Sequence, residues 1–416
     1  MRIYDIISRI SNLKTFSSFK IPAYRMYFFG MVGQWSSFSM EMVARSYLIY
    51  EITGSAVMLG AINLSGAVPI LILSLFGGAV ADRFPKKTLI QLSQIGMTLV
   101  FLGYAIAVNI GYLSKDHPES WWVLLAGGTV MGTIIALAMP SRAAIIPEIV
   151  DQERLMNAIS LNTMGMSFFQ LIGPAIAGYI IEGFGYSIVF FIMAGLNAAA
   201  IIFTSFLPKT FPVRVNRKNV LKDIVEGFRY INSHRTVRLI LAFFIAAILL
   251  AMPFQMLMPV FAKDILQVGV GGQGTLMSMS GVGAIMASLV IASLPSRRRA
   301  ITLLVSNMIM GTALVVFAFS TSWPLSLATM IVVGIGRIGG NTTGNALLQT
   351  HTEPEYLGRV MSIMMLNFGL SGLGTFFAGI LAETISAPWA IGGLAMVLIG
   401  ISLLALIFLP GFRKLD

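Results

Sequence analysis

Apolar residues dominate twelve long stretches of the chain, and polar residues collect in the segments between them. A helix needs about 20 apolar residues to cross a hydrocarbon core about 30 Å thick, and each stretch approaches that length. We predict helices at 24–50, 56–80, 88–110, 121–140, 156–182, 186–207, 238–262, 273–294, 301–320, 324–349, 360–383 and 388–409. This pattern predicts an all-α membrane protein with twelve transmembrane helices.

The longest polar segment separates the sixth predicted helix from the seventh. Within it, one apolar stripe recurs at helical spacing, which predicts a helix on the membrane surface. The stripe consists of Val220, Leu221, Ile224, Val225, Phe228 and Ile231. Near the N-terminus, Ile3, Ile6, Ile10 and Leu13 have a similar spacing. There, a surface helix and a loose basic tail are both open interpretations.

The two predicted halves resemble each other. At an offset of 202 residues, Glu153, Leu155 and Ser160 align with Glu355, Leu357 and Ser362, in the link from the fourth to the fifth helix of each half. Duplicated six-helix halves are typical of transporters that rock two bundles about a central site. We therefore expect two pseudo-symmetric six-helix bundles. The predicted segments are an N-terminal segment 1–21, a bundle 22–207, a linker 208–237, a bundle 238–410 and a tail 411–416.

Charged residues are sparse, and the basic ones are unevenly distributed. Only 11% of the 416 residues are charged and 56% are hydrophobic, whereas soluble domains carry about 25% charged residues. Of the 28 Lys and Arg residues, 23 lie on the side of both termini, and only Lys115 and Lys263 lie opposite. Basic loops mark the cytoplasmic side. We expect a multi-pass protein of the bacterial inner membrane with both termini in the cytoplasm. This topology accounts for the net charge of +11 without a nucleic-acid partner.

Sequence signatures of enzymes are missing. The chain has no Cys, and its three His residues fall in predicted loops. Neither a G-x-x-x-x-G-K-S/T phosphate-binding loop nor an H-E-x-x-H metal motif occurs. We therefore expect no enzymatic activity, no metal and no cofactor.

The link between the second and third predicted helices contains the most specific motif. It resembles the loop signature of the major facilitator superfamily, with Pro85 in place of the usual glycine. The matching residues are Gly78, Asp82, Arg83, Lys86 and Lys87. The resemblance implies a conformational latch, in which Asp82 accepts from a helix N-terminus and from a basic residue in one state. Arg142 and Arg359 are the candidate partners. The alternative is a plain basic loop.

Further segments are similar to the branch of this superfamily that contains the bacterial enterobactin exporter and related efflux proteins. They lie at 48–55, 140–148, 155–162, 226–230 and 357–362. The resemblance implies the major facilitator fold and export of an amphipathic small molecule, such as a drug-like compound or a siderophore, coupled to protons. Gly173, Pro174 and Gly178 partly match an antiporter motif. The fourth predicted helix ends before Arg142, so we expect no arginine inside it.

Polar side chains within the predicted spans mark a candidate cavity for substrate and coupling ion. They are Gln34, Glu41, Arg45, Asn63, Gln170, Gln255, Arg337 and Asn341. Glu41 and Arg45 are four residues apart and can neutralise each other, so a structural pair and a proton-coupling pair are both open. Arg337 has no carboxylate in its own helix, and a charge at the bilayer centre costs about 2.5–3.5 kcal/mol, which favours a wet cavity. For each lone amide, the alternative is a hydrogen bond between helices.

These features predict a monomeric exporter that works by alternating access. Its expected partners are a small-molecule substrate, the lipid bilayer and H⁺ as the candidate coupling ion. Two other functions stay open. One is a uniporter or importer of a lipid-like or organic solute, and the other is a membrane sensor that moves nothing. Asp82 with its basic neighbours and the duplicated halves favour transport. Substrate-dependent flux in proteoliposomes separates transport from sensing.

Overall fold

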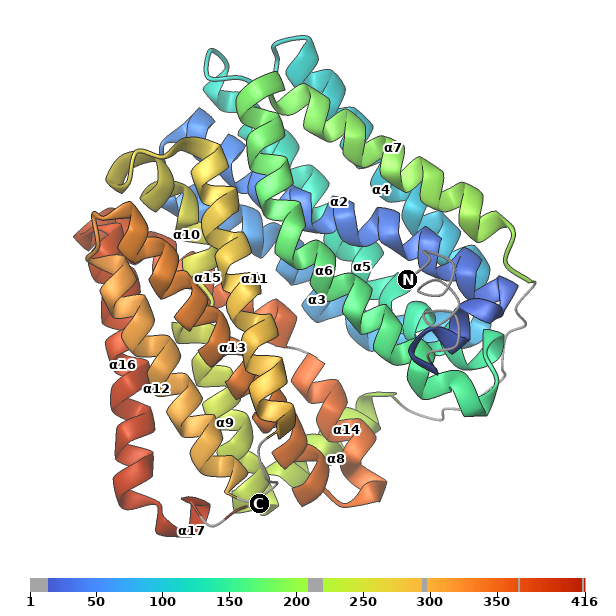
Figure 1. Ribbon diagram of the computed structural model, residues 1–416, viewed down its shortest axis with the longest axis vertical. Coiled ribbons are helices and arrows are strands. Elements are labelled where there is room, and N and C mark those ends of the chain that lie inside the picture. The colour runs from blue at the N-terminus through green and yellow to red at the C-terminus, as the bar shows by residue number, and fades with distance from the viewer. Residues whose placement is uncertain (1–13, 209–219, 294–297, 366, 414, 416) are drawn as a thin grey trace, which may run out of the picture.

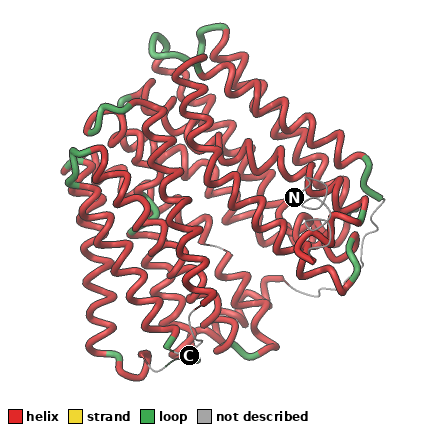
Figure 2. Tube along the Cα trace, in the orientation of Figure 1, coloured by secondary structure: helices red, strands yellow, loops and turns green. Residues whose placement is uncertain are grey.

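The computed structural model describes residues 14–208, 220–293, 298–365, 367–413 and 415. Helices make up nearly all of this part of the chain, which contains no strand (Figure 2). A first group of helices follows a short 3₁₀ turn. Its elements are η1 (Lys14–Lys20), α2 (Pro22–Thr53), α3 (Ala56–Arg83), α4 (Lys86–Asn109), η2 (Pro118–Ser120), α5 (Trp121–Ile149), α6 (Gln152–Phe184) and α7 (Tyr186–Ser205).

A second group follows the linker. Its elements are α8 (Val220–Ser233), α9 (Arg235–Leu250), α10 (Phe254–Val260), η3 (Phe261–Ile265), α11 (Gly269–Ser293), α12 (Arg299–Ala318), α13 (Trp323–His351), α14 (Pro354–Met365), α15 (Asn367–Ile385), α16 (Ala387–Phe408) and α17 (Pro410–Arg413). Within the described residues, ten helical stretches are long and apolar enough to cross a membrane. The shorter apolar helix α15 and the more polar helix α2 complete the twelve predicted spans.

Local sequence explains where several helices begin and end. Pro22 opens α2, where its fixed φ suits the first helical turn. Gly54 ends that helix with a φ of 64°, a left-handed conformation that favours glycine. The Ser55 side chain then accepts a hydrogen bond from the backbone N–H of Met58 and so caps the start of α3. These two caps make the sharp link between α2 and α3.

Two predicted helices differ from the observed ones. The predicted helix 238–262 is interrupted between α9 and α10, where Pro253 lacks the N–H needed to continue the helix. The predicted helix 360–383 is covered by α14 and α15, between which only residue 366 lies outside the described part of the chain. Conversely, α5 passes through Pro140 and Pro147 and continues to Ile149. Membrane helices tolerate proline because neighbouring groups satisfy the freed backbone atoms.

The linker helix α8 is observed where the sequence predicts a surface helix. Its apolar residues divide between two environments. Tyr230 and Ile231 are buried, whereas Val225 and Phe228 are more than half exposed. The side chains of residues 220–224 and the predicted N-terminal helix at residues 3–13 lie outside the described part of the chain.

The helices run between two ends that differ in chemistry. We call the end with the α3–α4 link, the α5–α6 link and α8 the basic end. The far end has the α2–α3 link, the segment from α4 to η2, and the links α6–α7, η3–α11, α12–α13 and α15–α16. The two groups of helices meet toward the far end and diverge toward the basic end, at the lower right of Figure 1.

Contacts between the groups run from the far end to the middle of the helices. Along α3 and α15, the Ser55 hydroxyl donates to Glu383, and the Asn63 amide donates to the Thr375 hydroxyl at 3.0 Å. Farther along these two helices, Leu71 packs against the backbone at Gly369. Along α6 and α11, Tyr179 bonds Thr275 at 3.2 Å, Pro174 packs on Gly274, and Leu171 packs on Gly281. The two seams close the far half of the molecule.

Candidate functional site

Arg337 lies midway along α13, between close contacts with two other helices. Gly334 packs against the Ser280 carbonyl of α11, and Gly340 packs near Asn307 of α12. At 100° per residue, Arg337 lies about 60° from each of these faces. Its Nε atom is buried and has no hydrogen-bond partner, and its guanidinium pairs with no carboxylate of the described residues. Arg337 is thus a half-buried cation without a counter-ion in the described part of the protein.

Two asparagines extend this polar surface toward the basic end. Asn341 is exposed one turn beyond Arg337, and Asn345 follows after a second turn. The Asn345 amide nitrogen donates to the Asn341 backbone oxygen at 2.9 Å and to its Oδ1 at 2.6 Å. We call Arg337, Asn341 and Asn345 the α13 polar stripe. The sequence analysis missed Asn345, although its four-residue spacing from Asn341 was the available signal.

Glu41 and Arg45 form an ion pair within the first group of helices. They are 2% and 8% exposed, respectively. Arg45 also donates from Nη1 to the Ile62 carbonyl of α3 at 3.5 Å and lies against Gly128 of α5. The contacts of Arg45 beyond the pair are therefore with helices of its own half.

The other four predicted amides, apart from Asn341, are scattered rather than clustered. Asn63 bonds across the α3–α15 seam, and the Gln34 amide donates to the Ser93 hydroxyl of α4 at 3.5 Å. Gln170 is exposed on α6, and Gln255 is half-buried just after the interruption before α10. Asn63 and Gln34 thus make the hydrogen bonds between helices that were the alternative interpretation for lone amides.

Arg142 lies deeper within its helix than the sequence predicts. Because α5 continues to Ile149, Arg142 lies seven residues inside the helix, about 10 Å from its end. Its Nη2 donates to the Ser93 hydroxyl at 3.1 Å, and its carbonyl accepts from the Tyr27 hydroxyl at 3.0 Å. The fourth membrane helix therefore does contain an arginine inside it.

The described residues of the predicted latch bind within their own halves. Lys86 pairs with Glu148 of α5, and Lys87 donates to the carbonyls of Ser205 and Leu207 at 2.7 and 2.6 Å. Arg83 is exposed. The placement of Gly78 and the side chain of Asp82 lie outside the described part of the protein. A contact of Asp82 with Arg142 or Arg359 therefore stays a prediction.

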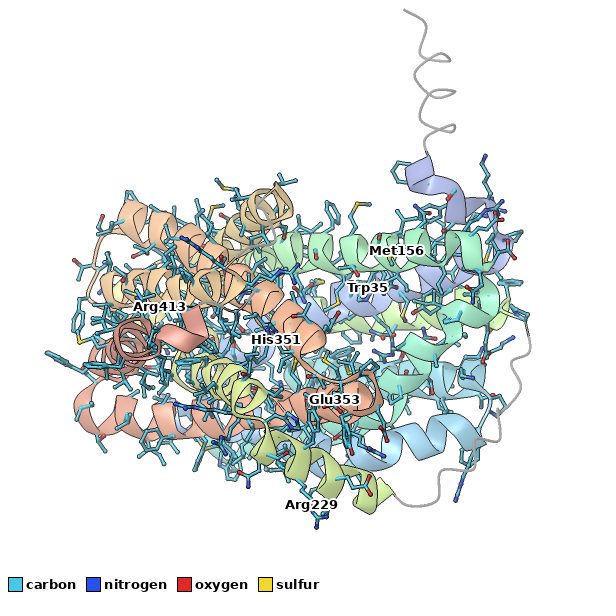
Figure 3. The ribbon with its side chains drawn as sticks, turned by 90° about the horizontal axis from the view of Figure 1, so that it is seen from below. Trp35, Met156, Arg229, His351, Glu353 and Arg413 are labelled. Carbon is cyan, nitrogen blue, oxygen red and sulfur yellow. The ribbon has the colours of Figure 1, made fainter. Side chains whose placement is uncertain are left out.

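Arg359, the other candidate partner, is held by the linker helix. Its Nη2 pairs with Glu226 of α8 at 3.0 Å, and its guanidinium lies 5.1 Å from the Tyr356 ring centre. Tyr230 of α8 stacks on Tyr356 with ring centres 4.4 Å apart, and its hydroxyl accepts from the Glu353 N–H at 3.1 Å. Figure 3 shows α8 beside α14 at the basic end, with labels at Arg229 and Glu353. These contacts fix α8 to the second half.

Polar contacts across the far end were not predicted. The Tyr50 hydroxyl of α2 donates to Asp264, and the Lys263 amine lies 5.3 Å from the Tyr50 ring centre. The Gln273 amide of α11 donates to the Ser46 hydroxyl of α2 at 3.0 Å. We call these contacts, together with that of Ser55 and Glu383, the far-end seal. Its partners are more than 200 residues apart in the chain, so no local pattern could reveal them.

Comparisons with known proteins support this architecture. The family described as "Transmembrane secretion effector" matches residues 13–416. The staphyloferrin A transporter of Staphylococcus aureus is 26% identical over 361 residues, which are 85% of this chain and 86% of that protein. The multidrug efflux pump Tap of Mycolicibacterium fortuitum is 26% identical over 398 residues, with 91% and 93% covered.

Solved structures of other transporters share the fold. A variant of the peptide transporter POT superposes with a TM-score of 0.74 at 13% identity, covering 94% of this chain and 95% of that chain. A variant of the nucleoside transporter NupG gives 0.71 at 17% identity, with 94% and 99% covered. At such identities, these structures show the fold alone. The predicted all-α membrane protein with the major facilitator fold is therefore confirmed.

The family match extends over nearly the whole chain, and the relatives are membrane transporters rather than enzymes. The prediction of a superfamily member resembling efflux proteins is thereby confirmed, as is the prediction that the protein is not an enzyme. This chain belongs to the transmembrane secretion effector family of major facilitator transporters.

Proposed function

We propose that the protein exports an anionic, amphipathic small molecule across the bacterial inner membrane in exchange for protons. The observation that carries this proposal is Arg337, a half-buried guanidinium whose buried Nε has no partner and which pairs with no described carboxylate. A charge at the bilayer centre costs about 2.5–3.5 kcal/mol on insertion scales. An anionic group of the substrate offsets that cost, and Asn341 and Asn345 supply hydrogen-bonding groups beside it.

The proposed orientation follows from the distribution of charge. Basic loops remain in the cytoplasm, so we assign the basic end to that side. The far-end seal then closes the molecule on the outside, and the present arrangement is the one that receives substrate from the cytoplasm. Export requires the far-end seal to part and the basic ends to meet. Asp82 with Arg142 or Arg359 is our candidate latch for that second state.

The direction of transport rests on two kinds of support. The family description refers to secretion, and the relative Tap is named as an efflux pump. The other open function within transport is a uniporter or importer of an organic solute. It predicts downhill flux that an imposed pH gradient does not drive.

Proteoliposome flux tests the proposal. Two fluorescent amphiphiles are compared that differ only in a carboxylate and the corresponding carboxamide, with and without an imposed pH gradient. We expect gradient-driven transport of the carboxylate and little transport of the carboxamide, with protein-free liposomes as the control. Equal transport of both compounds contradicts anion recognition by Arg337. Equal transport with and without the gradient contradicts proton exchange.

A further inference from the structure

An apolar groove lies at the basic end between the start of α2 and the end of α7. It has a volume of about 710 Å³, and the described residues that line it are all apolar. Pro22, Ala23 and Met26 form the α2 side, and Phe203, Phe206 and Pro208 form much of the α7 side. Because the surface that the described residues give the groove is predominantly apolar, the groove suits a hydrocarbon chain.

The groove persists because its two walls are fixed. Lys87 donates to the carbonyls of Ser205 and Leu207 and so holds the end of α7. Phe29 of α2 contacts Phe203 of α7, with ring centres 5.7 Å apart. Phe29 lies two turns beyond Pro22 and one turn beyond Met26, on the side of the far end. Phe206 remains 70% exposed. Large exposed apolar side chains at this position meet lipid rather than water.

Two basic side chains flank the groove at the level where α2 begins. Lys20 precedes the lining residue Ile21 directly, and Arg25 lies about 60° around the helix from Pro22. Both are exposed, and neither pairs with a carboxylate of the described residues. An apolar chain site beside two unpaired cations is complementary to an acyl chain that carries a negatively charged headgroup.

We propose that this groove binds an anionic phospholipid, with one acyl chain between α2 and α7 and the headgroup phosphate at Lys20 and Arg25. The site is separate from the α13 polar stripe, which lies in the other half of the molecule. A bound lipid bridges the first and the last helix of the first half. It therefore stabilises that half as a unit, whichever substrate the transporter moves.

Native mass spectrometry of the purified full chain tests the proposal. The protein is titrated with phosphatidylglycerol and phosphatidylcholine of identical acyl chains. Each basic residue near an anionic headgroup contributes about fivefold in affinity. We therefore expect Lys20→Gln with Arg25→Gln to weaken phosphatidylglycerol binding by about 25-fold and to leave phosphatidylcholine binding within about twofold. Arg235→Gln, which removes an exposed charge at the start of α9, is the matched control and is expected to change neither.

A second variant tests the apolar part of the site. Ala23→Phe places a ring in the groove and is expected to reduce occupancy by both lipids without changing the charge. Equal affinity of the unmodified protein for the two lipids overturns the proposal. So does an equal loss in Arg235→Gln and in the double variant, or unchanged lipid occupancy in Ala23→Phe.

Discussion

Arg45 and Arg337 are guanidinium groups inside membrane helices, one from each half of the molecule, and they have different surroundings. Arg45 on α2 is 8% exposed and pairs with Glu41 one turn away. Arg337 on α13 is half-buried, and its Nε has no partner among the described residues. Both cations lose much of their hydration, but of the two only Arg45 has an opposite charge beside it among the described residues.

The difference separates a permanent interaction from an intermittent one. Removing one partner of a buried ion pair costs about 3–5 kcal/mol, because the other charge is left uncompensated. The Glu41–Arg45 pair is thus suited to hold α2 against α3 and α5. Arg337 retains a charge that no described carboxylate neutralises, so it is open to solvation by water or to pairing with an anionic ligand. We therefore favour a structural role for the pair and a binding role for Arg337.

The largest expected effect is a loss of stability when one charge of the Glu41–Arg45 pair is removed. Glu41→Gln leaves Arg45 buried without a counter-ion, and we expect about 3–5 kcal/mol lower stability. Thermal unfolding of the purified protein measures this loss. The double variant Glu41→Gln with Arg45→Gln removes both charges and is expected to recover most of it.

The proton-coupling interpretation of Glu41 predicts a different outcome for the same variant. If Glu41 carries the proton, Glu41→Gln keeps its stability, loses accumulation driven by a pH gradient and retains downhill exchange. That result contradicts the structural role assigned to the Glu41–Arg45 pair, because the pair would then open and close during transport.

The next largest effect is expected on ligand binding when the charge of Arg337 is removed. Charge-assisted hydrogen bonds contribute about 1.5–3 kcal/mol, so Arg337→Gln is expected to weaken binding of a carboxylate ligand by about 10–100-fold. Binding of the matched carboxamide is expected to change by less than about threefold. Equal losses for the two ligands in a binding titration indicate a packing defect and count against the recognition role.

A third variant makes α13 resemble α2. Asn341→Asp places a carboxylate one turn from Arg337, at the spacing of Glu41 and Arg45. We expect about tenfold weaker binding of the carboxylate ligand and unchanged or higher thermal stability. Asn345→Asp adds the same charge two turns away and serves as the matched control. Similar losses in both variants point to general repulsion of the anion rather than to pairing with Arg337.

The smallest effect is expected at the basic link, where charge lies outside the spans. Asp82→Asn is expected to reduce transport by about fivefold while ligand binding stays unchanged, because it shifts the balance of two states by about 1 kcal/mol. Flux and binding are measured on the same preparation. Glu119→Gln, an exposed carboxylate at the far end, is the control. A wild-type rate for Asp82→Asn contradicts the latch.

The fold was largely predictable, because the bilayer imposes one length and one polarity on every span. The exceptions occurred at prolines, because a proline within an apolar stretch interrupts one helix and is accommodated in another. Pro253 interrupts a span, whereas α5 continues through Pro140 and Pro147. Neighbouring helices decide whether the freed backbone groups find partners, and sequence pattern does not reveal those neighbours.

The candidate site was predictable residue by residue but not as an arrangement. Helical spacing alone identified the Glu41–Arg45 pair, and the lack of a nearby carboxylate identified Arg337. The partners of Asn63 and Tyr50 lie in the other half of the chain, at Thr375 and Asp264. Such pairings depend on how two bundles pack in one state, which no local spacing contains.

The glycines of the two seams have a practical consequence for trapping the transporter. A Cβ added at Gly379 would lie 2.6 Å from the Ala56 carbonyl oxygen, and one at Gly274 would overlap the backbone of Pro174. The methyl group of an alanine at either position would clash in the closed seam and destabilise it, and would make no such clash once the seam has opened. Conformation-specific antibodies or inhibitors that recognise the open seam could thus be selected on these alanine variants. The selection would need no bound substrate.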